Sequence, residues 1–251
     1  MLRYIIFLPV IILVISCGQN KQEQQNEAGT DSTVADSVAI LKDPKNNVNI
    51  QTNSFSEIDS SGILMFPLSM GESERTVGSV SSSYYGEMPG NSFWNVIFLN
   101  SRTNEYHLLS ESKMLIQNFD YKNTSDNSKR ITQSSRYLYY SVITDDYDKD
   151  NKLTDEDPVY LFVSDKEGNN FRQISPAHYD LQNWQFIKSV NKILLTVKKD
   201  SDNNNKYDNY DEVTTFEVDI DKGTGAKEIF STDFKNGLKL LYERDWKRLK
   251  K

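Results

Sequence analysis

Residues 159–176, VYLFVSDKEGNNFRQISP, carry the clearest strand signal in the chain. An apolar run of β-branched and aromatic residues fills the first half, a cluster of Asp, Glu, Gly and Asn follows, and FRQIS ends the segment. This order predicts two strands joined by a tight turn. A second apolar run, YLYYSVIT at 137–144, lies upstream and predicts a further strand of the same unit.

Two other parts of the chain repeat this order of strand, loop, strand, tight turn and short strand. The first contains ILMFPLSM (63–70), WNVIFLN (94–100) and EYHLLSE (105–111), and the third contains ILLTVKK (193–199), VTTFEVD (213–219) and AKEIFS (226–231). A preceding run, LQNWQFIKS at 181–189, adds a fourth strand. Strong helical periodicity is missing until the last residues. We therefore predict an all-β protein made of antiparallel four-stranded β-meander repeats.

The segment 159–176 resembles the repeat of TolB-type bacterial β-propellers, in which an acidic, glycine-containing turn is followed by a strand of the form R-x-L/I-[ST]. The resemblance is strong in the second unit, partial in the third and weak in the first. It implies four-stranded blades and a platform for binding. Because natural propellers have about 4 to 8 blades and this chain has three units, we expect a partial or small propeller-like fold, with a β-sandwich as the alternative.

The N-terminal residues have the layout of an export signal. Arg3 is followed by an apolar stretch from Tyr4 to Ile15, which is too short to span a bilayer. The stretch ends in Val-Ile-Ser-Cys, which resembles the lipobox of bacterial lipoproteins and implies that Cys17, the chain's one cysteine, receives the lipid anchor. We predict a signal peptide at 1–16, a disordered tether at 17–44 and a β-propeller-like domain of about three repeats at 45–251.

These features place the protein in the bacterial cell envelope, attached to a membrane through lipid, at the outer membrane on its periplasmic side or at the cell surface. The formal net charge of −7 gives no support for binding to nucleic acid.

Two acidic loops lie between the second and third strands of the second and third units, at 146–157 and 200–211, and start 54 residues apart (200 − 146 = 54). Oxygen-bearing side chains alternate along each loop, as Ca²⁺ requires when six to eight oxygens must surround one ion. The pattern resembles an EF-hand loop. The predicted calcium ligands are Asp146, Asp148, Asp150, Lys152, Asp157, Asp200, Asp202, Asn204, Lys206, Asp208 and Asp211, with the two lysines contributing backbone carbonyls.

The loops depart from the EF-hand pattern at two positions. Asn151 and Asn205 replace the glycine of position 6, and aspartate replaces the longer glutamate of position 12. The neighbouring residues favour strands over helices, so the loops look like the calcium loops inserted in β-hairpins of integrin-type propellers. The alternative is a pair of solvated acidic turns without an ion.

Catalytic motifs are missing from the sequence. His107 lies in a predicted strand and His178 in a loop, and neither has a motif around it. We expect a non-catalytic binding or assembly protein whose ligand is an envelope protein or a glycan. The alternative is an envelope hydrolase acting on glycan or peptide, since two strand carboxylates could serve such a reaction.

Three units also leave sheet edges open, and open edges invite pairing with other chains. Either the C-terminal segment covers an edge or two copies form a homodimer. Leu238, Leu240 and Leu241 are the candidates for packing a last strand or a short helix onto the first unit.

Overall fold

The structure is a computed structural model that describes residues 50–52, 55–70, 92–120 and 136–247. The chain divides into two units, residues 1–47 and 48–251, and every described residue belongs to the second. The predicted signal peptide, Cys17 and the tether lie outside the described residues.

The described strands form three antiparallel sheets that follow one another along the chain. The strands of the first sheet are β1 (Ile50–Thr52), β2 (Ser56–Glu57), β3 (Ile63–Met70), β4 (Asn95–Asn100) and β5 (Glu105–Leu108). The second contains β6 (Leu115–Asp120), β7 (Tyr137–Ile143), β8 (Tyr160–Asp165) and β9 (Arg172–Gln173), and the third contains β10 (Tyr179–Ile187), β11 (Lys192–Lys199), β12 (Glu212–Val218) and β13 (Lys227–Glu228).

The second and third sheets are four-stranded meanders in which each strand pairs with the next, so the prediction of all-β meander repeats is confirmed. The first sheet differs because it has five strands, and β1 and β2 both pair with β3. Strand β6 was not anticipated, since Gln117 and Asn118 interrupt its apolar pattern and its register with β7 shifts between Ile116 and Asn118.

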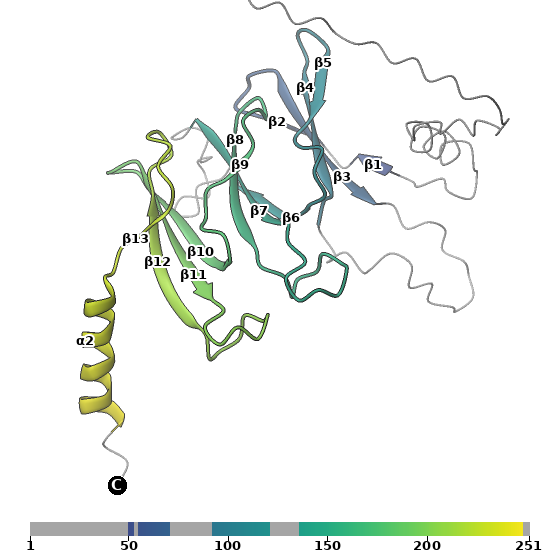
Figure 1. Cartoon of the computed structure of the whole chain (residues 1–251). Coiled ribbons are helices and arrows are strands. Elements are labelled where there is room, and N and C mark those ends of the chain that lie inside the picture. The colour runs from purple at the N-terminus through teal and green to yellow at the C-terminus, as the bar shows by residue number, and fades with distance from the viewer. Residues whose placement is uncertain (1–49, 53–54, 71–91, 121–135, 248–251) are drawn as a thin grey trace, which may run out of the picture. The chain divides into compact units, whose positions relative to one another are not determined.

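The second sheet lies between the other two and contributes to both hydrophobic cores. Leu138, Tyr140 and Val142 pack with the first sheet, whereas the alternate residue Tyr139 packs with the third. Because both of its faces are covered, β7 consists of a nearly continuous apolar run. The sheets follow one another in chain order in Figure 1.

The turn between β8 and β9 locks the second sheet to the first. Gly168 has a φ of +84° and lies against the ring of Phe98. Lys166 forms an ion pair with Asp59 at 2.9 Å. Nε2 of His107 lies 3.0 Å from the carbonyl oxygen of Glu167, and its ring stacks on Phe98 with centroids 5.7 Å apart. The glycine turn between β8 and β9 therefore holds two sheets together.

The C-terminal segment forms a helix, α2 (Thr232–Tyr242), followed by the π-helical turn η3 (Glu243–Lys247). Ser231 caps the helix by accepting a hydrogen bond from the backbone N–H of Phe234 at 3.2 Å. The helix is tied to the third sheet because Lys235 forms ion pairs with Glu212 and Glu228 at 2.9 and 2.7 Å. In the part of the chain that the structure describes, no helix has the length and apolar character needed to span a membrane.

The predicted packing of Leu238, Leu240 and Leu241 onto the first unit is wrong. Their exposed fractions are 50%, 72% and 48%, and no side chain of α2 is buried. The prediction failed because the helix starts directly after the third sheet and its ion pairs hold it there.

Candidate functional site: two acidic loops

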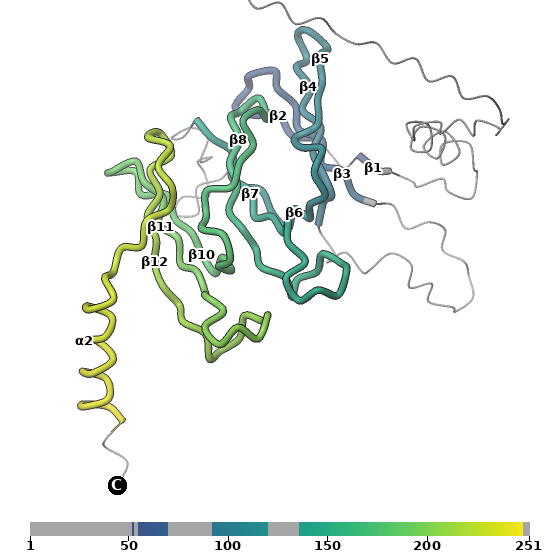
Figure 2. The backbone as a smooth tube through the Cα atoms, viewed as in Figure 1, coloured from purple at the N-terminus to yellow at the C-terminus, as the bar shows by residue number. Residues whose placement is uncertain are grey.

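The two predicted loops connect equivalent strands of neighbouring sheets. The first joins β7 to β8 and the second joins β11 to β12. Both lie at the same end of their sheets in Figure 2. Their strands are fixed by antiparallel pairing up to Val142–Tyr160 in one sheet and Lys199–Glu212 in the other, so each loop starts and ends on ordered backbone.

Each loop gathers three carboxylates around one point. In the first loop, one carboxylate oxygen each from Asp146, Asp148 and Asp157 lies within 4.8 Å of the others. In the second loop the same holds for Asp200, Asp202 and Asp211. These are positions 1, 3 and 12 of each loop. Either cluster can therefore hold a metal ion through oxygen donors.

Backbone hydrogen bonds fold the first loop around its carboxylates. The N–H of Asn151 donates to Asp146 at 2.9 Å, and the N–H of Asp150 donates to Asp148 at 3.1 Å. The N–H of Lys152 donates to Asp150 at 2.8 Å. Lys149 and Asn151 both have positive φ, which turns the chain back on itself after every second residue.

The second loop repeats these bonds at the same positions. The N–H of Asn205 donates to Asp200 at 3.0 Å, that of Asn204 to Asp202 at 3.2 Å, and that of Lys206 to Asn204 at 2.8 Å. Positive φ recurs at Asn203 and Asn205. Asparagine tolerates this region better than most residues, which explains how it replaces glycine at position 6 in both loops.

The position-12 aspartates close the loops. Asp157 accepts hydrogen bonds from the N–H groups of Tyr147 at 2.7 Å and Thr154 at 2.9 Å. Asp211 accepts the equivalent bonds from Ser201 and Asp208, at 2.7 and 2.9 Å. An aspartate at this position thus reaches the centre of the loop and also fixes its two halves.

The pKa values of the buried aspartates shift in opposite directions in the two loops. Burial raises the pKa of Asp157, although the N–H groups of Thr154 and Tyr147 act in the opposite direction. Burial also acts upward on the pKa of Asp200, but hydrogen bonds from the Tyr147 hydroxyl and from backbone N–H groups outweigh it, so the pKa of Asp200 is lowered.

One oxygen in the first loop is well suited to a cation. Oδ1 of Asp146 is buried and has no hydrogen-bond partner among the described residues, whereas Oδ2 accepts from Asn151. A buried carboxylate oxygen without a partner loses its hydration energy unless a cation or a donor replaces the water. The donor set of the loop therefore fits a metal ion.

The structure brings together six of the eleven predicted ligands. Asp150 and Asp208 lie outside the two carboxylate clusters, and their side chains instead accept backbone N–H bonds from Lys152 and Tyr210. Asn204, Lys206 and Lys152 take part in the same ladder of turns.

Two tyrosines at the loops were missed by reasoning from the sequence. Tyr147 is position 2 of the first loop and Tyr207 is position 8 of the second, and their rings lie 5.0 Å apart. The hydroxyl of Tyr147 donates to Oδ2 of Asp200 at 2.9 Å. An aromatic residue inside an acidic loop was the available signal, because a solvated turn has no need of one.

Neither histidine belongs to the two loops. His107 packs on Phe98 and the β8–β9 turn, and His178 is an exposed residue with a φ of 62° just before β10.

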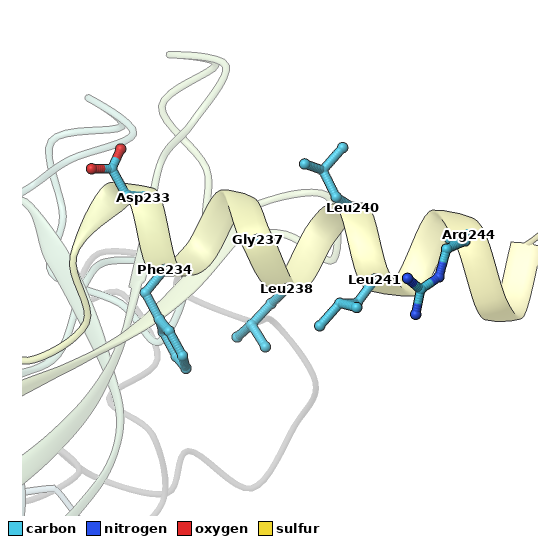
Figure 3. A pocket seen from close by; sticks show the side chains of 7 residues that line it. All are labelled: Asp233, Phe234, Gly237, Leu238, Leu240, Leu241 and Arg244. Atoms are coloured by element: carbon cyan, nitrogen blue, oxygen red, sulfur yellow. The ribbon is translucent and has the colours of Figure 1, made fainter.

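A second surface feature is the apolar side of α2 (Figure 3). Phe234, Leu238 and Leu241 point the same way from the helix, while Leu240 points to the other side. The groove along the helix is lined by Asp233, Phe234, Gly237, Leu238, Leu240, Leu241 and Arg244. Phe230 extends the apolar side by stacking on Phe234 with centroids 5.5 Å apart.

No family model, no curated protein and no solved structure matches this chain.

Proposed function

We propose that this protein is a lipid-anchored, calcium-binding β-protein of the bacterial cell envelope that acts as a non-catalytic binding or assembly module. The observation that carries the proposal is the repetition of one loop geometry in two neighbouring sheets. The same positions supply the carboxylates, the same backbone N–H groups orient them, and the same positions have positive φ.

Calcium suits this donor set better than other common metals. All grouped donors are carboxylate oxygens, which are hard ligands, whereas zinc prefers the nitrogen and sulfur of His and Cys. Magnesium demands strict octahedral geometry and keeps several waters, while calcium accepts irregular sets of oxygens. Asp146, Asp148 and Asp157 would hold one ion, and Asp200, Asp202 and Asp211 a second.

The ion would stabilise the fold more than it would signal. Each empty loop holds like charges close together at the tip of a hairpin, and a bound cation removes that repulsion. A ligand that binds only the folded state stabilises it by about 2.7 kcal/mol when its free concentration is 100 times Kd. Extracellular calcium sites function at Kd values of about 10⁻⁴ to 10⁻³ M, which suits loops with aspartate at position 12.

Calorimetric titration of the chain from residue 17, with Cys17→Ser to keep it free of lipid, tests this function. We expect two calcium ions per chain and a melting temperature that rises with calcium and falls again with chelator. No heat of binding at millimolar calcium, together with a melting temperature indifferent to chelator, would refute the proposal.

The assembly role rests on two apolar surfaces that the described residues leave partly or fully exposed. The first is the helix side with Phe234, Leu238 and Leu241. The second is the outer face of the first sheet. Two cross-strand rows form it, Leu64 with Leu99 and Tyr106, and Phe66 with Ile97 and Leu108. Their neighbours Ile63, Met65, Val96 and Phe98 enter the core.

A second copy of the chain is the partner that we propose for these surfaces. The second sheet separates the first from the third, so the first-sheet face and the helix belong to opposite ends of the stack. Overall charge favours contact between copies, because residues 232–251 carry seven bases and three acids, a net charge of +4. With −7 on the whole chain, residues 1–231 carry −11 (−7 − 4 = −11). A homodimer in which each α2 lies on the partner's first sheet covers both apolar surfaces.

A further inference from the structure

Tyr147 connects the two acidic loops through hydrogen bonds to both carboxylate clusters. Its backbone N–H donates to Oδ1 of Asp157 at 2.7 Å, within the first loop. Its hydroxyl donates to Oδ2 of Asp200 at 2.9 Å, in the second loop. One residue therefore contacts position 12 of one cluster and position 1 of the other.

The Tyr147 ring packs against the second loop, and the nearby Asp145 is anchored to β8. Its face packs on Tyr207 of the second loop, with centroids 5.0 Å apart and planes inclined by 33°. Close by in the chain, Asp145 accepts a hydrogen bond from the hydroxyl of Tyr160 at 2.9 Å, which anchors the start of the first loop to β8. The packing on Tyr207 and the bond to Asp200 hold the ring in one orientation, and the backbone N–H of the same residue bonds to Asp157.

This contact is one of several that orient Asp200. The residue is only 6% exposed, its Oδ2 accepts bonds from both the Tyr147 hydroxyl and the N–H of Asn205, and its Oδ1 accepts a bond from the N–H of Asn204. A cation that draws Asp157 into place in the first loop also orders Tyr147, and an ordered Tyr147 presents Asp200 in its binding orientation. The second loop is then already partly ordered, so less conformational entropy is lost when the second ion binds.

We propose that the two loops bind calcium as a positively coupled pair, with Tyr147 as the link. This inference rests on the proposed calcium binding. Coupling between binding sites is reciprocal, so either loop can be filled first and will raise the affinity of the other by the same factor. Coupled sites in proteins commonly change each other's affinity by about 5- to 150-fold.

Electrostatic repulsion between the two ions opposes this coupling. The first ion cancels negative charge that would attract the second. Such charge effects are screened beyond about 8 Å at physiological salt, whereas the hydrogen bonds and ring packing of Tyr147 are direct contacts that salt does not screen. Raising the salt concentration should therefore strengthen the apparent cooperativity while it lowers both affinities.

The test is a calcium titration of the chain from residue 17 carrying Cys17→Ser. Calorimetry is done at about 0.15 M and at about 0.5 M salt, so that charge screening differs between the two experiments. We expect the second association constant to exceed its statistical value by about 5-fold or more. Tyr147→Phe keeps the ring and the backbone N–H but removes the hydroxyl bond to Asp200. In this variant both sites should still bind, and the coupling factor should fall towards one.

Tyr210→Phe is the matched control, because Tyr210 lies in the second loop with a ring that is 91% exposed. It should leave the cooperativity unchanged. A double-mutant cycle separates coupling between the loops from direct damage to the second loop. Asp146→Asn with Asp148→Asn should weaken calcium binding at the second loop in the parent chain but not in the Tyr147→Phe background.

The outcomes are distinct. No calcium binding at all contradicts the proposed function. Two ions that bind independently or with negative cooperativity contradict only the coupling, and full cooperativity in Tyr147→Phe contradicts the role of Tyr147.

Discussion

Gly168 lies so close to Phe98 that a Cβ atom added to Gly168 would stand 2.3 Å from Cδ2 of the ring. The glycine belongs to the second sheet and the phenylalanine to the first, where Phe98 is 2% exposed and part of the core. The φ of +84° at Gly168 is a second reason why another residue would fit poorly. The turn is thus shaped for contact between sheets.

Gly168→Ala should destabilise the protein markedly. The left-handed backbone costs about 1–2 kcal/mol with a Cβ, and forcing the extra atom against a packed ring costs about 1–3 kcal/mol more. For a domain of about 200 residues the melting temperature should fall by roughly 5–15 °C. Thermal unfolding of the parent and the variant measures this fall. Gly223→Ala is the control, because Gly223 also has positive φ, at +61°, but nothing lies within 4 Å of an added Cβ. An equal fall in melting temperature in the two variants would contradict the contact between Gly168 and Phe98 as the cause.

Removing the carboxylates of one loop should remove part of the calcium response and leave the fold intact. We expect Asp146→Asn with Asp148→Asn, or Asp200→Asn with Asp202→Asn, to reduce the rise in melting temperature on adding calcium. The strands do not pack through these side chains, so the melting temperature without calcium should stay the same or rise slightly as repulsion is relieved. Thermal unfolding with calcium and with chelator measures both effects. A calcium response that survives in the chain with all four substitutions would show that the ion binds elsewhere.

Asp180 should make stability depend on pH in the acidic range. Its Oδ1 accepts the N–H of Val159 at 2.9 Å, which joins β10 to the start of β8. Burial raises the pKa of Asp180, and hydrogen bonds and Lys198 offset this only in part. The folded state therefore favours the protonated form, and ionisation costs stability as pH rises through the folded pKa.

Asp180→Asn keeps the acceptor for Val159 and removes the charge. The variant should be more stable than the parent at neutral pH, and the difference should shrink as pH falls below about 4, where the parent carboxyl is protonated in both the folded and the unfolded state. Melting temperatures of both proteins from pH 3 to pH 8 decide the matter. A variant that is less stable at neutral pH, or a difference that does not change with pH, contradicts the assignment.

The apolar side of α2 should control self-association. Leu238→Glu with Leu241→Glu should convert a dimer into a monomer, as measured by light scattering of the chain from residue 17 with Cys17→Ser. Asn236→Glu is the control, because Asn236 is exposed on the same helix but does not line the groove. A parent chain that is monomeric at high concentration would refute the dimer.

Lipid attachment should depend on Cys17. Cells labelled with a fatty-acid analogue should incorporate it into the protein, and Cys17→Ser should abolish the label. Equal labelling of the variant would contradict the lipoprotein assignment.

Strand positions followed closely from apolar runs bounded by turn residues. The predicted segment at 63–70 coincides with β3, and the run at 137–144 differs from β7 by one residue. These strands are long and have at least one buried face, so burial imposes a pattern that the sequence must show. β6 and β1 lack that pattern, and pairing with a neighbouring strand defines them instead.

The sequence was enough to predict the two acidic loops and their six clustered carboxylates, but not the contacts between the loops. Carboxylates at alternate positions indicated both loops, since local backbone turns bring such residues together. The bond from Tyr147 to Asp200 spans 53 residues and depends on how two sheets stack. Likewise, nothing local in the sequence indicated that Gly168 meets Phe98.

The alternation of residues along β11 limits where a further unit could be added to this array of sheets. Ile193, Leu195 and Val197 enter the shared core, whereas Thr196 and Lys198 lie with Leu194 on the other side of the strand. A further unit added after the third sheet would bury those polar side chains. The opposite end already has an apolar outer face on β3 and β4, so an engineered array could gain a unit there with few substitutions.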